Sequence, residues 1–279
     1  MNEEDCKFQK IELFHQMIDK KDISYMFYNM YNSICFSTFP YLLYKESNSA
    51  QSIRSYNSGN CIAFVYFMKM YLLKNHHVKS YIIGASVPDL FKVDGTPHMC
   101  HCALLVPIST SEFYVIDGAL YFIEPMYCSL HDMKERQIYS CNAHRHEKTI
   151  IRYSLQPCKT CELDNNYSQI IPKDSLCIHA QYDALPEQQW NYYLIEIKNP
   201  DNNIGKSFLE YKPDPFIMYT VYEGGIVKMK YKLEIQNEEL IIKEYPSGNI
   251  IYRGDTYDDN PNLFNIKRKL HRYLSDYMI

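Results

Sequence analysis

The chain has 279 residues, of which 46% are hydrophobic and 22% charged, enough for a globular core. Its net charge is −4, and it carries no basic stripe, which disfavours nucleic acid as a partner. No apolar run approaches the ~18 residues of a membrane span, and the acidic N-terminus does not resemble a signal peptide. We therefore expect a cytoplasmic (intracellular) protein with no membrane partner, whose ten cysteines are reduced thiols.

The first part of the chain is predicted to be helical. Apolar residues recur near helical spacing over residues 7–44. Residues Asn57–Asn60 form a turn, because they are small or tolerate the left-handed conformation. The next segment, Cys61–Leu73, is apolar on both sides, which is typical of a buried helix.

Strands follow this helix. The pattern predicts strands at Val78–Ala85, His101–Pro107 and Phe113–Asp117, the last two joined as a hairpin. After residue 125 the composition shifts to Cys, His, Asn and Pro, with one strand near Thr149–Leu155. A domain boundary is expected there, giving residues 1–126 and 127–279 as the two domains.

The C-terminal part reads as β-structure closed by a helix. Runs with β-type composition, separated by turn residues, are Trp190–Ile197, Phe216–Tyr222, Ile226–Ile235, Leu240–Tyr245 and Ile250–Arg253. An amphipathic helix is predicted over Asn262–Tyr277. The fold class is therefore α+β: an N-terminal helical region packed on an antiparallel β-sheet or barrel, with a C-terminal helix.

Three residues occupy the settings that a thiol-based catalyst needs. Cys61 opens a helix, whose positive dipole end favours a thiolate, so this helix start would carry the nucleophile. His101 begins one predicted strand, and Asp117 ends the next, directly before a glycine. An imidazole can exchange protons with a thiolate, and a carboxylate can fix the imidazole tautomer. Cys61, His101 and Asp117 are therefore the candidate catalytic residues.

Simpler interpretations stay open. Cys61 can be a small core residue, His101 an ordinary strand histidine and Asp117 a turn former. His98 competes with His101 because both precede the same apolar strand. We favour His101, because His98 would leave Met99 and Cys100 to begin the strand.

A second group of residues has the spacing of metal ligands. Short pairs of this kind can present two ligands of a tetrahedral zinc site from one turn. The sharper hypothesis is a structural zinc, and the simpler one is a set of scattered reduced cysteines, so we assign no metal site. The four residues that would hold the zinc are Cys141, His144, Cys158 and Cys161, with His146, Cys177 and His179 nearby in sequence.

The catalytic segments resemble a branch of the papain-like superfamily that includes arylamine N-acetyltransferases and transglutaminase-like enzymes. The matching segments are Ser58–Cys61, His101–Val106 and Tyr114–Gly118, in the same order and at similar separations. The chain departs from the acetyltransferase motif at Asn57 and Ser58, where that family has Arg and Gly. The match covers less than a third of the chain.

The resemblance implies an acyltransferase that moves an acyl group from a thioester through a Cys61 acyl-enzyme to an amine. It implies acetyl-CoA or another acyl-CoA as a cosubstrate, with no tightly bound cofactor, and a small-molecule amine or a protein as acceptor. Two alternatives remain: transglutaminase-like or peptidase activity on protein amides, or an inactive scaffold that keeps the fold.

Overall fold

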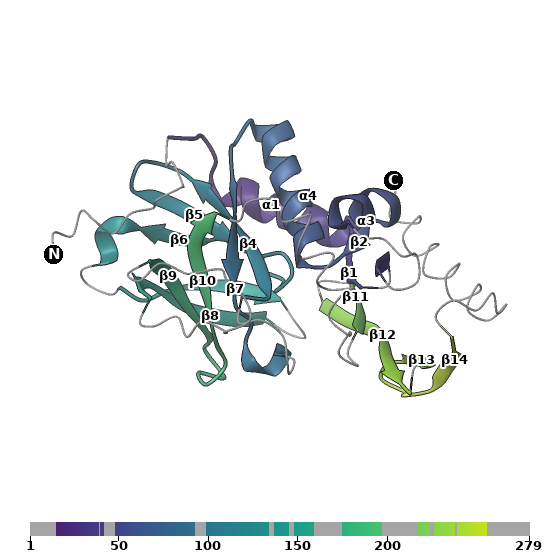
Figure 1. The fold of residues 1–279 in the computed structure, drawn as a ribbon. Coiled ribbons are helices and arrows are strands. Elements are labelled where there is room, and N and C mark those ends of the chain that lie inside the picture. Colours follow the sequence, from purple (N-terminus) through teal and green to yellow (C-terminus); the bar gives the residue numbers. More distant parts are fainter. Residues whose placement is uncertain are drawn as a thin grey trace. The chain divides into compact units, whose positions relative to one another are not determined.

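The fold is described by a computed structural model, which covers residues 15–38, 40–41, 48–92, 99–133, 137–144, 148–158, 175–196, 217–223, 226–237 and 239–255 (Figure 1). Contacts within the chain divide it into two compact units. Unit 1 comprises residues 1–27 and 68–198, and unit 2 comprises residues 28–67 and 199–279. Each unit contains one β-sheet, so strands that are distant in the sequence come together within it.

Unit 1 is built on an antiparallel sheet in the order β6-β5-β4-β3-β10-β9-β8-β7. Its strands are β3 (Tyr81–Ala85), β4 (His101–Pro107), β5 (Glu112–Ile116), β6 (Met126–Ser129), β7 (Tyr139–His144), β8 (Lys148–Pro157), β9 (Leu176–Tyr182) and β10 (Gln189–Glu196). The segment before β6 also bonds to β7, because the His144 N–H donates to the Tyr121 carbonyl at 2.8 Å and Phe122 bridges to Ala143. These bonds link the two ends of the sheet into a nearly closed barrel.

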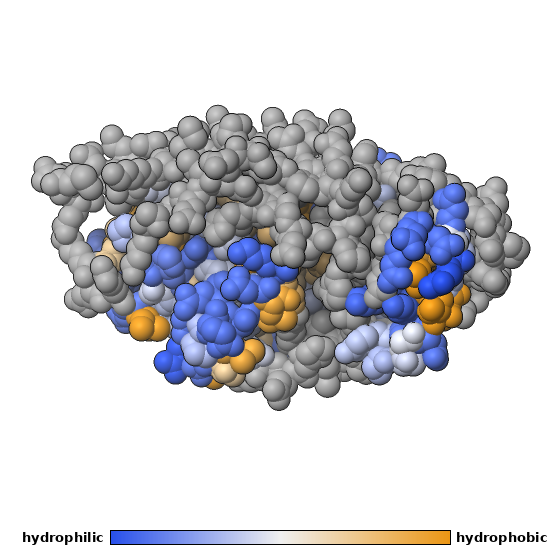
Figure 2. All heavy atoms as spheres, turned by 60° about the horizontal axis from the view of Figure 1, so that its bottom comes forward, coloured by the Kyte–Doolittle hydropathy of each residue, from blue (hydrophilic) through white to orange (hydrophobic). Residues whose placement is uncertain are grey.

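The centre of this sheet forms the core of unit 1. Every residue of β3 and β4 is buried, as expected for near-continuous apolar strands. Large fully buried side chains in this unit are Trp190, Tyr192, Tyr193, Phe113 and Phe122. On the face shown in Figure 2, most of the described surface is hydrophilic, and hydrophobic residues form small separate areas.

Unit 2 contains a sheet in the order β14-β13-β12-β11-β1-β2. Its strands are β1 (Cys35–Ser37), β2 (Ser58–Gly59), β11 (Ile217–Glu223), β12 (Ile226–Gln236), β13 (Glu239–Glu244) and β14 (Ile250–Gly254). The strands pair antiparallel except for β1 and β2, which are parallel. The short strand β1 therefore holds the segment before Cys61 against a C-terminal hairpin.

Three helices are described. The division of residues between the units falls within α1 (Lys20–Ser33) and within α4 (Cys61–Tyr71), and α3 (Ser49–Tyr56) belongs to unit 2. A π-helical turn over Leu72–His76 continues α4. No helix in the described part of the chain is long and apolar enough to cross a membrane.

The predicted α+β class with an antiparallel sheet or barrel is confirmed, and β4 has the bounds predicted for it. The helix predicted over residues 7–44 is wrong at residues 35–37, which form β1. Phe36 pairs there with Gly59 on one side and Thr220 on the other, and such distant partners override a local helical pattern. The predicted helix at 262–277 lies outside the described residues.

The region of residues 127–183 contains more β-structure than its composition predicts. Strands β6, β7 and β9 lie there in addition to the predicted one. The domain boundary expected between residues 126 and 127 falls at the first residue of β6, inside unit 1. Strands from both sides of that position join one sheet through the pairing of β3 with β10, which no local pattern reveals.

The core of unit 1 makes a testable contribution to stability. Phe113 is fully buried in β5. Phe113→Ala should lower the free energy of unfolding by about 3–5 kcal/mol, because it removes a buried ring and leaves a cavity. Urea denaturation followed by fluorescence of the single tryptophan measures this loss.

The matched control is Ile150→Ala in β8, whose side chain is 44% exposed. It should cost less than about 1 kcal/mol. Equal losses for the two variants would contradict the assignment of Phe113 to the core.

Candidate active site

A row of residues across three strands holds the candidate histidine. His101, the first residue of β4, pairs with Ala85 at the end of β3, and Ala85 pairs with Tyr192 of β10. Directly paired residues project to the same face of a sheet, so the two rings flank the small Ala85 side chain. Main-chain and side-chain bonds between Ser86 and Asn191, at 2.9 and 2.8 Å, continue the pairing and fix its register.

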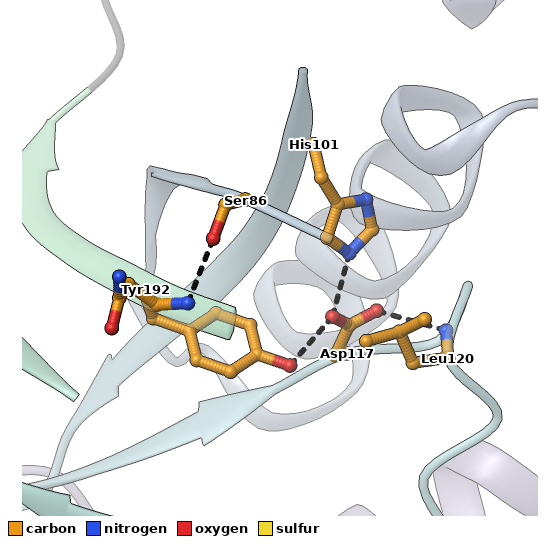
Figure 3. A network of polar contacts seen from close by, with 6 residues as sticks. Ser86, His101, Asp117, Leu120 and Tyr192 are labelled. Carbon is orange, nitrogen blue, oxygen red and sulfur yellow. Dashed lines mark hydrogen bonds and ion pairs between the residues drawn. The ribbon is translucent and has the colours of Figure 1, made fainter. Parts of the chain in front are cut away.

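Asp117 binds both rings of this row. It directly follows β5 and is fully buried. Its Oδ2 accepts hydrogen bonds from His101 Nε2 at 2.7 Å and from the Tyr192 hydroxyl at 2.9 Å (Figure 3). Its Oδ1 accepts from the Leu120 N–H at 3.1 Å. The carboxylate is thus bound by donors from two strands and a turn, as a buried charge requires.

The turn after β5 explains why an aspartate suits this position. The Phe122 N–H donates to the Asp117 carbonyl at 3.2 Å, while the Leu120 N–H donates to its side chain. Asp often closes turns by such local bonds. Asp117 is therefore both a turn former and a hydrogen-bond partner of His101.

The contacts of Asp117 assign the histidine tautomer. A carboxylate only accepts hydrogen bonds, so Nε2 of His101 carries the proton that it shares with Asp117. In the neutral ring, Nδ1 is then the nitrogen that can take a proton from a thiol. Burial raises the pKa of Tyr192 well above its ordinary value, and the Asp117 charge adds to this, so Tyr192 stays a donor.

Cys61 begins α4 in unit 2, and its residue is 8% exposed. The preceding loop is tightly packed. A Cβ added to Gly59 would lie 2.3 Å from the Cβ of Ala63, so only glycine fits there. Asn60 caps the helix, because its Oδ1 accepts from the N–H groups of Ile62 and Ala63 at 3.1 and 3.3 Å. Cys61 therefore lies at a helix N-terminus whose first turn is held by a side-chain cap.

The structure brings two of the three predicted residues into contact, His101 and Asp117. Cys61 belongs to unit 2 and the other two residues to unit 1, so the approach of its sulfur to His101 is part of the function proposed below. The competing His98 lies outside the described residues. The sequence assigned no functional role to Tyr192 or Asn60. Tyr192 stood out only as a tyrosine in a predicted strand, and Asn60 only as an asparagine before a predicted helix.

The four-ligand zinc hypothesis does not fit the described ligands. Cys141 pairs with Ile151 near the start of β8, whereas Cys158 follows the end of that strand. The strand from Ile151 to Cys158 is about 23 Å long, at ~3.3 Å per residue. Cys141 and Cys158 are therefore too far apart to bind the same metal ion. Cys161 lies outside the described residues, and within the described ranges no three metal-ligating side chains form a group. Cys177 and His179 do meet, with Sγ and Nε2 3.3 Å apart.

Solved structures of arylamine N-acetyltransferases share this fold. The protein from Bacillus cereus is 14% identical, with 92% of this chain and 91% of its own covered, at a TM-score of 0.55. Arylamine N-acetyltransferase C from Bacillus anthracis is 14% identical, with 98% of both chains covered, at a TM-score of 0.54. The Mycobacterium smegmatis protein is 12% identical, with 92% of this chain and 88% of its own covered, at 0.52.

No protein-family model matches the sequence, and no curated protein sequence matches it. Similarity at 12–14% identity, over about 90% of the chain or more, establishes the fold. The chain has an arylamine N-acetyltransferase-like fold.

The Tyr192 hydroxyl should stabilise the buried carboxylate measurably. Tyr192→Phe is expected to lower the free energy of unfolding by about 1.5–3 kcal/mol, the range for a hydrogen bond to a charged group. In an Asp117→Asn background the same change should cost about 1 kcal/mol or less, because the charge is gone. Chemical denaturation of the four proteins in this cycle gives the coupling. Identical costs in both backgrounds would show that the hydroxyl does not support Asp117.

Proposed function

We propose that the protein is an acyltransferase that moves an acyl group from a thioester donor to an amine through a Cys61 acyl-enzyme. The observation that carries this proposal is the buried bond between His101 and Asp117, in a fold shared with arylamine N-acetyltransferases. Cys61 at the start of α4 supplies the nucleophile. Cys61, His101 and Asp117 are the catalytic set in this proposal.

The first half-reaction forms the acyl-enzyme. His101 Nδ1 takes the proton of the Cys61 thiol, and the thiolate attacks the carbonyl carbon of the donor thioester. The tetrahedral intermediate collapses with loss of the donor thiolate, which receives the proton back from the imidazolium. Asp117 stabilises the imidazolium and holds the ring in the required tautomer.

The second half-reaction transfers the acyl group. The acceptor amine attacks the carbonyl carbon of the Cys61 thioester, and His101 takes a proton from the amine nitrogen. The carbon–sulfur bond breaks, and the sulfur regains the proton from His101 as the amide leaves. Tyr192 acts indirectly, since its bond to Asp117 keeps the carboxylate in place during both half-reactions.

The substrates are inferred from the resemblance. An acyl-CoA, such as acetyl-CoA, suits the donor role, and it binds as a cosubstrate that leaves after each turnover. The structural neighbours are named as arylamine N-acetyltransferases, which supports a small-molecule amine as acceptor before a protein amine. The Bacillus cereus neighbour is described as having a Cys-His-Glu triad, whereas this chain carries Asp117. A cytoplasmic location remains a prediction.

The acyl-enzyme can be detected directly. Incubation with acetyl-CoA or a longer acyl-CoA should add one acyl group to the wild-type protein, seen by intact-mass spectrometry. Cys61→Ala should abolish the adduct, because the attacking sulfur is gone. Cys35→Ala is the matched control, since it removes another buried thiol of unit 2 and should leave the adduct intact.

The alternatives give different results. Amide cross-linking or cleavage of proteins, lost in Cys61→Ala and without an acyl-CoA adduct, would replace acyl transfer with the transglutaminase-like or peptidase reaction. No adduct, no cross-linking and a Cys61 that alkylates like an ordinary thiol would identify a scaffold.

The ion pair can be tested without a substrate. Iodoacetamide should alkylate wild-type Cys61 rapidly well below pH 8, because the thiolate persists there beside imidazolium. In His101→Ala the pH for half-maximal alkylation should rise toward about 8.5, the value of an ordinary thiol. Asp117→Asn should raise it less, since the ring remains. A wild-type midpoint already near about 8.5 would reject the pair.

A further inference from the structure

Asn60, the residue directly before Cys61, is unusually tightly held. It is 1% exposed, and its Oδ1 lies within 3.0–3.3 Å of four atoms that can donate a hydrogen bond, two backbone nitrogens and two hydroxyl oxygens. Two of these donors are the backbone N–H groups of Ile62 and Ala63, which cannot accept hydrogen bonds. The side-chain atom facing them must therefore be the oxygen, so the orientation of the amide is fixed.

Two buried hydroxyls complete the cap. Tyr41 and Ser49 are 2% and 0% exposed, and their oxygens are 2.7 Å apart. Each hydroxyl has one proton, so two of the three contacts among the Tyr41 hydroxyl, the Ser49 hydroxyl and Asn60 Oδ1 can be hydrogen bonds at one time. The Asn60 N–H in turn donates to the Tyr41 oxygen at 3.4 Å.

The amide nitrogen of Asn60 is the anomaly in this network. Its Nδ2 is buried and has no hydrogen-bond partner within the described structure. An aspartate here would accept from the same donors and would be favoured by the helix dipole. Its second oxygen would take the place of Nδ2, buried and without a donor, which is costly for a charge. The sequence has the neutral amide directly before the candidate nucleophile.

We propose that Asn60 is a positioning residue for Cys61: its neutral side chain fixes the first turn of α4 without placing a second negative charge beside the thiolate. This inference rests on the proposed function, in which Cys61 reacts as a thiolate. A carboxylate one residue away would oppose formation of that thiolate by Coulomb repulsion.

The titratable groups around the cap agree with this role. Burial raises the pKa of Tyr41 to about 12, with hydrogen bonds opposing and the charge of Cys61 adding to the rise, so its phenol is neutral at pH 7. On β1, the Cys35 thiol lies 4.0 Å from the Asn57 carbonyl, to which it donates. In the proposed function His101 supplies the positive partner, so Asn60→Asp would introduce a competing anion at the cap.

The discriminating variant is Asn60→Asp, because it keeps the capping oxygen and changes the charge. Its thermal stability should be lower than that of the wild type, because the buried carboxylate has one oxygen without a donor, so alkylation is measured below the onset of unfolding. The pH for half-maximal alkylation of Cys61 by iodoacetamide should rise by about one unit. Below that midpoint, alkylation should be about tenfold slower. An unchanged midpoint in Asn60→Asp would show that charge at this position does not act on Cys61.

Two further variants separate the effect of the new charge on Cys61 from the effect of a disrupted helix cap. Asn60→Ser is a neutral cap and should keep the alkylation midpoint within about 0.3 unit of wild type. Asn48→Asp places the same new charge at the cap of α3, where Asn48 accepts from the Gln51 N–H at 3.0 Å. That change should leave the midpoint equally unaffected, because Asn48 is partly exposed to solvent.

The outcomes distinguish the two proposals. The inference is supported if wild-type Cys61 alkylates rapidly and only Asn60→Asp raises the pH for half-maximal alkylation. The inference is overturned if wild-type Cys61 alkylates rapidly but the midpoint does not rise in Asn60→Asp, or rises equally in Asn60→Ser. The acyltransferase proposal stands in both cases. A wild-type Cys61 that alkylates like an ordinary thiol overturns both.

Discussion

The buried carboxylate of Asp117 is the constraint on which the arrangement of unit 1 depends. A charge with no access to water must be bound by donors, and three elements supply them: β4 through His101, β10 through Tyr192 and the turn through Leu120. Because β3 lies between β4 and β10, two strand pairings must keep their register for both rings to reach one oxygen. A slip of one residue would move either ring to the opposite face of the sheet. The barrel and the hydrogen bonds to Asp117 therefore both require the same register of these strand pairs.

Cys61, the proposed nucleophile, is positioned by different contacts. The loop before Cys61 is fixed by close packing at Gly59, by the parallel pairing of β1 with β2, and by a buried polar cap at Asn60. These contacts order the start of a helix, where the backbone itself supplies a favourable field for a thiolate. Sheet register holds His101 within unit 1, and helix capping holds the start of α4 within unit 2.

The departures from the acetyltransferase motif have a structural explanation. Asn57, at the position of the family's arginine, adopts a left-handed conformation with φ of 46° and closes α3 through its N–H bond to the Ile53 carbonyl. Asparagine tolerates this conformation better than most residues. Ser58 then enters β2, and its carbonyl accepts from the Ser52 hydroxyl at 2.6 Å. The loop is thus built from backbone capping and short polar side chains.

The sequence by itself determined the local settings of the site: a helix that starts at Cys61, a buried strand that starts at His101, and a turn at Asp117. Each leaves a trace within a few residues, as apolar periodicity or turn chemistry. Only the tertiary structure decided the partners: Tyr192 for Asp117, Tyr41 and Ser49 for Asn60, and β11 for β1. It also separated Cys141 from Cys158, which spacing alone had grouped as zinc ligands. Contacts between residues far apart in the chain depend on strand order and register, and no local pattern in the sequence encodes these.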